Sequence, residues 1–423
     1  MSMGQVALGL FFALAMSIAA PISGRQSRLN CALPHRMRQR LTPACLALLT
    51  GFWLAKASAD QSSLPDCSAS TAMPYLACLT SATNRPEPPH DFSGGRILHR
   101  GDTLNLRWRG AASAVQVEGT YGNYALALHP VAVDEWAASV RVPHLASLTE
   151  RFTFIATRAG GDELHDTIHF SGPEALPRSA QRGAVETVTL PSRHFAQGRQ
   201  VKVWLPPGHA ASQRYPVIYI ADGAAHFGDE LLTAMQSGRL PAMVVVGIEA
   251  DPAERFAEYV DFPKHEGLPS NPARFAAHER FIIETLLPWA ESNFGASNTP
   301  ADRTLAGFSN GADWAAAMAL RHPELFGRAI VMSPIMVSQY AIPDAPGARF
   351  DLSAGALEPP FALATACFAL RLHAKGHTVT LRWWPHTHSP EQWRTAFPAA
   401  LLNAPAAALP DARSCDVFRA EQP

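Results

Sequence analysis

The sequence predicts an α/β protein, in which a mostly parallel sheet carries helices on both faces, preceded by a small all-β sandwich. Three observations lead to this fold class. Apolar segments typical of strands buried on both faces alternate with helical segments between residues 183 and 410. Short runs with a period of two fill residues 93–175. Proline and glycine at 172–182 separate the two patterns, as expected of a linker between domains.

The larger domain divides into elements by the length and spacing of its apolar runs. Short continuous runs predict buried strands at 201–205, 217–221, 243–248, 329–333 and 379–383. A further strand is expected to begin near Phe350 and to end in a turn. Apolar residues at helical spacing, or a high alanine content, predict helices at 274–292, 313–321 and 361–375.

The smaller module, residues 93–175, resembles the immunoglobulin-like modules, because alternating runs such as 103–108 are separated by Gly-Asp and Gly-Gly-Asp turns. Four aromatic residues here allow two interpretations. They either fill the core of the sandwich or form a face that stacks on carbohydrate, and they are Trp108, Tyr121, Tyr124 and Trp136. The burial habits of aromatic side chains favour the core.

Two apolar stretches near the N-terminus predict an exported protein. The second stretch, 41–59, follows a basic segment and ends in Ala-Ser-Ala before Asp60, the pattern of a cleaved secretory signal peptide. Both stretches are shorter than a membrane span requires, and a retained anchor is the alternative. Met37 is an alternative start. We expect a leader at 1–59, an N-terminal arm at 60–92, a C-terminal tail at 411–423, and a periplasmic or secreted location.

Cysteine usage agrees with export. Four cysteines lie beyond the leader, and proximity along the chain pairs Cys67 with Cys78 and Cys367 with Cys415 in an oxidising compartment. Four free buried thiols are the alternative. None of the four belongs to a C-x-x-C motif, which argues against zinc and redox roles.

Composition narrows the classes of partner. The chain has 423 residues, of which 47% are apolar and 17% charged, as in globular proteins. Lys and Arg number 35 and Asp and Glu 36, which gives a formal net charge of -1. Because there is no basic excess, we expect no nucleic-acid partner. After processing of the leader, we expect no stable membrane span.

Residues 307–311, Gly-Phe-Ser-Asn-Gly, form a G-x-S-x-G motif between an apolar strand and an alanine-rich helix. In this context the motif is a sharp strand-to-helix turn that presents the serine hydroxyl above the sheet, and its glycines prevent steric clashes. The motif therefore predicts an α/β-hydrolase fold with Ser309 as the nucleophile. A plain loop containing glycine and serine is the alternative.

The serine requires a base, because a hydroxyl is a poor nucleophile at neutral pH. In this fold an acid and then a histidine follow the serine along the chain. His386 and His388 come directly after the last predicted strand, and a metal-binding pair is their alternative role. Glu358 is the expected acid, since Asp351 lies at the wrong end of its strand. A helix N-terminal carboxylate beside Pro359 is the alternative for Glu358.

An oxyanion hole requires two backbone N–H donors. One is expected from Asn310, the residue after the nucleophile. The other is expected from Gly223 or Ala224, in the loop after the strand at 217–221, where glycine permits a close approach of substrate. An ordinary turn at Asp222-Gly223 is the alternative.

Several ordered segments resemble the putative-esterase family, which includes enterochelin esterases, feruloyl esterases, antigen 85 mycolyltransferases and S-formylglutathione hydrolases. The segments are 199–208, 214–219, 222–223, 255, 258–259, 284–289, 302–303, 307–311, 322–326 and 333–334. The resemblance implies Ser309 as nucleophile and Glu358 as acid. It implies His388 as base because Trp393-Arg394 follows at the family's spacing. His386 and Ala312 stand where the family usually has glycine.

The resemblance implies an exported serine esterase of the enterochelin-esterase-like branch that forms an acyl-enzyme and uses no cofactor. Its segments also suggest a set of substrate-binding residues, namely Asp222, Arg255, Glu258, Tyr259 and Trp393. Arg255, Lys264 and His265 favour an anionic or siderophore-type ester, unless they are solvated loop charges. The alternatives are a feruloyl or acetyl esterase acting on carbohydrate, an acyltransferase, and a non-catalytic binding protein on a hydrolase scaffold.

Overall fold

The computed structural model describes residues 64–67, 74–80, 92–120, 125–175, 185–210, 212–224, 228–261, 271–344, 347–411 and 415. The predicted leader lies outside the described residues, as does most of the N-terminal arm and of the C-terminal tail. Four residues named above also lie outside them, namely Tyr121, Tyr124, Lys264 and His265.

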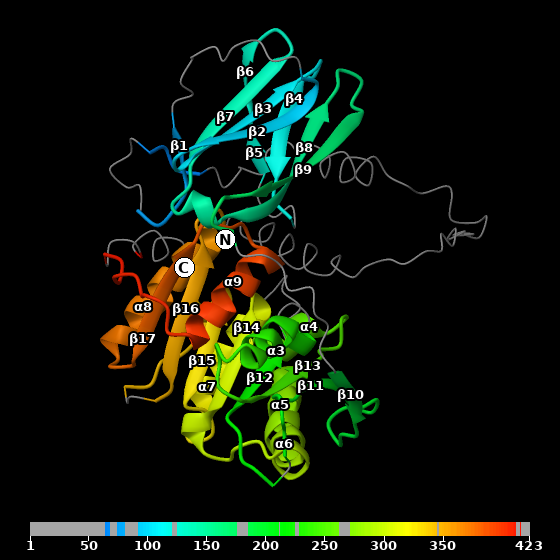
Figure 1. The fold of residues 1–423 in the computed structure, drawn as a ribbon, viewed down its shortest axis with the longest axis vertical. Helices are drawn as coiled ribbons and strands as arrows, with labels where there is room; N and C mark the ends of the chain where they lie inside the picture. Colours follow the sequence, from blue (N-terminus) through cyan, green and yellow to red (C-terminus); the bar gives the residue numbers. More distant parts are fainter. Residues whose placement is uncertain are drawn as a thin grey trace, which may run out of the picture.

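An eight-stranded sheet forms the centre of the larger domain (Figure 1), in the order β10-β11-β13-β12-β14-β15-β16-β17. The strands are β10 (Val185–Leu190), β11 (Arg199–Trp204), β12 (Val217–Ala221), β13 (Val244–Ile248), β14 (Arg303–Phe308), β15 (Arg328–Met332), β16 (Arg349–Gly355) and β17 (Val379–Trp384). From β13 to β17 neighbouring strands are parallel, while β10 and β11 pair in the antiparallel direction. The predicted strands agree with these to within two residues.

Helices lie between the parallel strands along the chain, and a last helix follows the final strand. They are α3 (Gly228–Gln236), α4 (Arg255–Tyr259), α5 (Pro272–Phe281), α6 (Leu287–Phe294), α7 (Asn310–Arg321), α8 (Pro359–Ala374) and α9 (Pro390–Leu401). A π-helical turn, Ile282–Leu286, joins α5 to α6, so the predicted helix at 274–292 contains an irregular turn. The turn comes just before Pro288, which has no N–H group to donate to the preceding turn.

The N-terminal module consists of two antiparallel sheets (Figure 1). One contains β1 (Cys78–Thr80), β7 (Glu135–Arg141), β3 (Thr103–Arg109) and β2 (Gly94–Arg100), with β6 (His129–Ala132) paired to β7. The other contains β5 (Ala125–Ala127), β4 (Ala114–Glu118), β8 (Thr149–Thr157) and β9 (Glu163–Ser171). Trp108 is 2% exposed in the core between them, and Trp136 packs against that core. For these two residues the core interpretation is supported.

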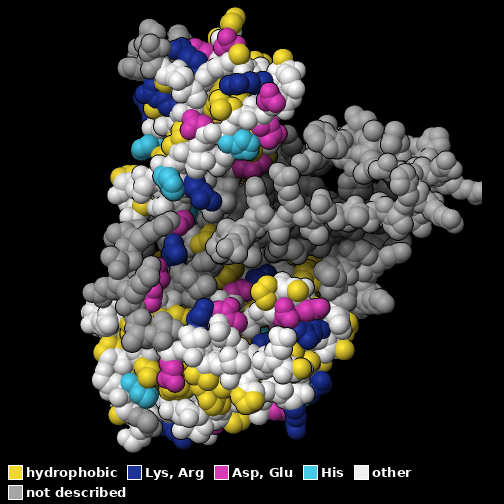
Figure 2. Space-filling view, turned by 90° about the vertical axis from the view of Figure 1, so that its right-hand side faces the viewer, with side chains coloured by type: hydrophobic (Ala, Val, Ile, Leu, Met, Phe, Trp, Pro, Cys, Tyr) yellow, Lys and Arg dark blue, Asp and Glu magenta, His cyan; other side chains and the backbone are white. Residues whose placement is uncertain are grey.

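On the surface shown in Figure 2, basic and acidic side chains are interspersed, and neither sign forms an extended patch on the described part of this face. This distribution agrees with the formal net charge of -1. Within the described ranges, no helix is both long enough and apolar enough to cross a bilayer.

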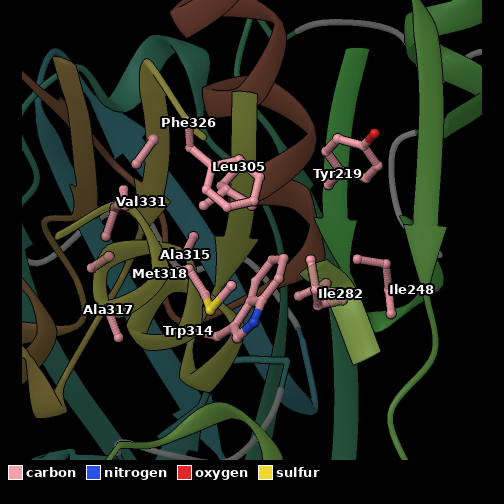
Figure 3. Packing of buried hydrophobic residues seen from close by; sticks show 14 of the residues in the cluster. Tyr219, Ile248, Ile282, Leu305, Trp314, Ala315, Ala317, Met318, Phe326 and Val331 are labelled. Atoms are coloured by element: carbon pink, nitrogen blue, oxygen red, sulfur yellow. The ribbon is translucent and has the colours of Figure 1, made fainter. Parts of the chain in front are cut away.

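The core of the larger domain has two parts, one on each face of the sheet. Alternate residues of β12 explain the separation: Tyr219 packs with α5, α6 and α7, whereas Ile218 and Ile220 pack with α3 and α9. On the first face Trp314 of α7 lies beneath the sheet (Figure 3) with Leu305 and Met318 close by. Alanine at most other core positions of α7 lets this helix approach β14 closely, which sets the position of its N-terminus.

Both predicted cysteine pairs are bonded. Cys67–Cys78 attaches the segment 64–67 to β1, where Leu79 N–H also donates to Pro65 O at 2.8 Å. Cys367–Cys415 attaches the C-terminal tail to α8. Each disulfide therefore links a peripheral segment to a strand or a helix, β1 in the first case and α8 in the second.

Candidate active site

Ser309 lies on the sharp turn between β14 and α7. Its φ and ψ are 55° and −131°, a conformation that a side chain makes costly. Residues 307 and 311 must be glycine, because a side chain at either position would lie too close to neighbouring atoms. A Cβ on Gly307 would lie 2.1 Å from Gly311 O, and one on Gly311 would lie 2.7 Å from the Cβ of Ala221. The turn therefore has the geometry that presents a serine at the carboxyl edge of the sheet.

His388 and Glu358 are brought together by the loops that follow β17 and β16. The distance between His388 Nδ1 and Glu358 Oε2 is 2.6 Å, and both side chains are buried. Glu358 Oε1 accepts three more hydrogen bonds, from Gly355 N at 2.5 Å, Ser333 Oγ at 2.6 Å and Gln392 Nε2 at 2.8 Å. The carboxylate is thus held by four donors, and Nε2 of His388 remains the nitrogen that can accept a proton.

Asp351, the other candidate acid, lies in a different environment. Its carboxylate contacts Arg328 at 2.8 Å, Arg349 at 3.1 Å and Arg382 at 3.3 Å. These ion pairs join β15, β16 and β17 away from the histidine. Of the two candidate acids, Glu358 is therefore the one that contacts His388, and Asp351 is not.

Aromatic contacts connect the serine turn to the histidine. Phe308, the residue before Ser309, stacks on Trp393 with ring centroids 3.9 Å apart. Trp393 and His388 are arranged edge to face with ring centroids 5.1 Å apart, and Phe361 stacks on the same imidazole with centroids 3.9 Å apart. Trp393 is buried, so the structure places this expected substrate-binding residue in the framework that holds the imidazole.

Ser333 and Gln392 are parts of the site that the sequence did not identify as functional. Ser333 has a positive φ of 53°, and its hydroxyl accepts a hydrogen bond from Gln392 Nε2 at 2.7 Å while donating to Glu358. Trp393 Nε1 also donates to Ser333 Oγ at 3.4 Å. The signals in the sequence are indirect: Ser333 ends a predicted strand and lies in the family-like segment 333–334, and Gln392 comes shortly after His388.

The turn that is expected to supply the second oxyanion donor follows β12. Asp222 and Gly223 have φ values of 55° and 61°. The turn is held by α4, because Asp222 N donates to Tyr259 Oη at 2.9 Å and the Asp222 carboxylate accepts from Arg255 at 2.6 and 2.7 Å. It also lies against the serine turn, since a Cβ on Gly311 would be 3.3 Å from Asp222 Oδ2. Burial raises the pKa of Tyr259 well above its usual value, which keeps the phenol neutral.

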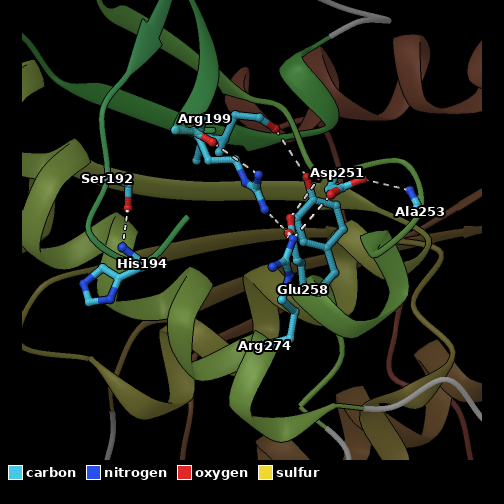
Figure 4. Close-up of polar contacts among 10 residues, drawn as sticks. Ser192, His194, Arg199, Asp251, Ala253, Glu258 and Arg274 are labelled. Carbon is cyan, nitrogen blue, oxygen red and sulfur yellow. Dashed lines mark hydrogen bonds and ion pairs between the residues drawn. The ribbon is translucent and has the colours of Figure 1, made fainter. Parts of the chain in front are cut away.

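Glu258 belongs to a buried ion cluster behind this turn (Figure 4). It pairs with Arg199, accepts from Arg274 Nε at 3.0 Å, and accepts from Asp251 N at 3.2 Å. Burial raises the pKa of its carboxyl, and the two guanidinium groups oppose that shift. The ion pair with Arg199 links α4 to β11. Glu258 therefore helps to fix the helix that carries Arg255 and Tyr259.

The two histidines after β17 have different partners. His388 contacts Glu358, whereas His386 Nε2 accepts from Thr149 N of the N-terminal module at 3.4 Å. Burial lowers the pKa of His386 to about 3. In the parts of the chain that the structure describes, no group of three or more His, Cys, Asp or Glu side chains is arranged to bind a metal.

Similarity to known proteins identifies the family. The family model described as Putative esterase matches residues 192–413, more than half of the chain. Two curated relatives come from Bacillus subtilis (strain 168). The uncharacterized protein YbbA is 30% identical over 145 residues, which are 32% of this chain and 57% of YbbA. The uncharacterized protein YjcH is 27% identical over 160 residues, which are 36% of this chain and 63% of YjcH. The chain thus spans less than two thirds of either relative.

Solved structures share the fold. The enterobactin esterase FES from Shigella flexneri superposes with a TM-score of 0.53 at 17% identity, over 74% of this chain and 96% of that chain. The ferric enterobactin esterase from Salmonella typhimurium gives a TM-score of 0.55 at 17% identity, over 73% and 95%. These shares exceed residues 192–413, so the superposition extends beyond the region that the family model covers.

The sheet order, the strained serine at the end of β14 and the superpositions define an α/β-hydrolase. Because the family model covers more than half of its length, the chain belongs to the Putative esterase family.

Proposed function

We propose that the protein is an exported serine esterase that cleaves carboxylic esters through Ser309, His388 and Glu358. The observation that carries this proposal is the buried 2.6 Å contact between His388 Nδ1 and Glu358 Oε2, which aromatic contacts through Trp393 connect to the serine turn. A histidine oriented by a carboxylate is the base that a serine nucleophile requires. Family membership supports the same chemistry.

In the proposed mechanism His388 Nε2 accepts the Ser309 hydroxyl proton while Oγ attacks the acyl carbon. Glu358 keeps the imidazole oriented and stabilises its positive charge. The imidazolium then gives its proton to the leaving alkoxide, and the acyl group remains on Ser309. Water, deprotonated by His388, attacks the acyl-enzyme, and the carboxylic acid leaves as Ser309 recovers its proton.

We assign the oxyanion hole to the backbone N–H groups of Asn310 and of Gly223 or Ala224. Asn310 begins α7, where a helix has N–H groups without an intrahelical acceptor and a favourable dipole. Gly223 is part of the turn that Asp222 anchors to α4. We therefore assign Asp222, Arg255 and Tyr259 to holding this turn.

A siderophore-type ester is the proposed substrate class. The superpositions with two enterobactin esterases cover nearly the whole of those chains and extend beyond the family-matched region of this one. The burial of Trp108 weakens the alternative of a carbohydrate ester recognised by module aromatics. We further propose that the two-sheet module is an immunoglobulin-like sandwich. The two disulfides support the proposed periplasmic or secreted location.

Labelling with a fluorophosphonate probe tests the proposed nucleophile. Wild-type protein beginning at Asp60 should label, whereas Ser309→Ala and His388→Ala should not. Ser292→Ala and His373→Ala are matched controls, because both side chains are exposed, and they should label like wild type. Hydrolysis of a catechol-acylated serine ester, compared with a feruloyl ester, then tests the substrate class. A folded wild-type protein that does not label would instead favour a binding protein on a hydrolase scaffold.

A further inference from the structure

Glu150 of β8 is a buried carboxylate at the contact between the N-terminal module and the hydrolase domain. It is 1% exposed, and its two oxygens have separate partners. Oε1 accepts from the module, namely from Thr120 Oγ1, from Thr120 N at 3.3 Å and from Arg151 N at 2.9 Å. Oε2 accepts from Thr387 Oγ1 and from Thr387 N at 3.4 Å. The carboxylate therefore bridges the two domains.

Thr387 is the residue before the proposed base. The loop that joins β17 to α9 has three successive residues with three different partners: His386 accepts from Thr149 N, Thr387 donates to Glu150, and His388 contacts Glu358. The module is also in tight contact here. A Cβ on Gly119 would lie 2.6 Å from Thr387 Cγ2 and 2.8 Å from its Oγ1. The backbone on the N-terminal side of His388 is thus held by the module.

The loop that carries the acid touches the module and also the segment 74–77, which leads into β1 of the module's sheet. Ala77 N donates to Ala356 O at 3.0 Å, and Leu357, the residue before Glu358, packs in the hydrophobic core of the module. Tyr75 stacks on Trp383 at the end of β17, with ring centroids 4.2 Å apart. Both loops of the acid–base pair consequently meet the same domain.

The kind of donors around Glu150 suits a carboxylate that fixes the position of Thr387 relative to the module. All five are neutral backbone N–H or hydroxyl groups, and the carboxylate remains an acceptor with a defined direction for each oxygen. A buried carboxylate is costly unless such donors surround it, so displacement of Thr387 would leave Oε2 unsatisfied. The arrangement resists movement of the loop relative to the module.

We propose that Glu150 is a positioning residue for His388, acting through Thr387, so that the N-terminal module is required for catalysis by the hydrolase domain. The inference rests on the proposed function, since it concerns the same histidine. Glu150 does not touch the reacting atoms. It sets where the imidazole lies relative to Ser309, and misplacement of a catalytic group by about 1 Å reduces rates by roughly a hundredfold.

The test compares Glu150→Gln and Thr387→Val with Thr387→Ser, which keeps the hydroxyl donor. The matched controls are Glu163→Gln and Thr153→Val, whose side chains bond only within the solvent-facing part of the module. Each protein is measured for the rate of fluorophosphonate labelling, for kcat and KM on a chromogenic ester, for the melting temperature, and for amide hydrogen exchange across 385–389.

We expect Glu150→Gln and Thr387→Val to slow labelling and kcat by roughly tenfold to a hundredfold with little change in KM, and to speed exchange at 385–389. Thr387→Ser and both controls should stay within twofold of wild type. The double variant should be no slower than the slower single variant, because both changes break one contact. If Glu150→Gln does not fold, the Val and Ser variants of Thr387 decide the question.

Wild-type labelling rates in both Glu150→Gln and Thr387→Val would overturn the inference, as would faster exchange without slower labelling. A rate loss matched by an equal loss in Thr387→Ser would also overturn it, because the hydroxyl would then not be the group that matters. Failure of the proposed function looks different: wild-type protein itself would not label, while the exchange comparison would still report whether Glu150 holds the loop.

Discussion

The two sides of the proposed active site, the acid–base side and the oxyanion side, are held by different kinds of interaction. On the acid–base side, Glu358 is surrounded by neutral donors and by His388, and the imidazole contacts two aromatic rings. On the oxyanion side, Asp222 pairs with Arg255, and Glu258 pairs with Arg199 and Arg274. A permanent cation beside Glu358 would weaken its stabilisation of the imidazolium. In the proposed mechanism the turn after β12 contributes only backbone N–H groups, so ion pairs can fix it without disturbing proton transfer.

Removing the charge on the acid–base side should have the largest effect. Glu358→Gln keeps the shape but no longer stabilises the imidazolium, and we expect kcat to fall by roughly 10³- to 10⁴-fold. Steady-state hydrolysis of a chromogenic ester measures the loss. Glu324→Gln, at an exposed position, is the control and should retain full activity. A loss of less than tenfold in Glu358→Gln would mean that another group orients His388.

Breaking the ion pair on the oxyanion side should have a smaller effect. Arg255→Leu leaves the Asp222 carboxylate unpaired beside the turn, and we expect kcat to fall by roughly a hundredfold, near the value of one oxyanion donor. Arg193→Leu, which breaks an exposed pair with Glu284, is the control. If KM rises while kcat is retained, Arg255 binds the substrate directly, and the comparison between the two sides would need revision.

A buried histidine lies behind each side, and each should make stability depend on pH. Burial lowers the pKa of His386 and of His278 to about 3, and Arg199 and Arg274 contribute at His278. Between pH 6.5 and 3 the unfolded chain therefore binds protons that the folded chain does not. The free energy of unfolding should fall with falling pH by up to about 1.4 kcal/mol per pH unit for each histidine.

Urea denaturation at pH 7, 5.5 and 4.5 checks this dependence. His278→Phe and His386→Leu should each show a shallower loss of stability in acid, by about one proton. His165→Gln, at an exposed position, should behave like wild type. A variant with an unchanged slope would show that its histidine titrates normally in the folded protein, and would limit acid sensitivity to the other side of the site.

Local sequence patterns were sufficient to predict many strands and helices of the fold. Continuous apolar runs predicted β12 and β13 because strands buried on both faces need such residues regardless of their neighbours. The helix α9 was not predicted, since Pro398 lies within it and proline ordinarily interrupts a helix. Cysteine pairs were predictable because each partner was the nearest available thiol along the chain.

The sequence by itself indicated the serine turn, the fold class, and Glu358 and His388 as candidates, because these depend on short motifs and on the order of elements along the chain. Only the tertiary structure decided what holds them. Ser333, Gln392 and Glu150 make hydrogen bonds between residues 25 to 237 positions apart. It likewise decided that Glu258, Tyr259 and Trp393 are buried. Such contacts leave no periodic pattern, since packing of distant segments determines which polar groups meet.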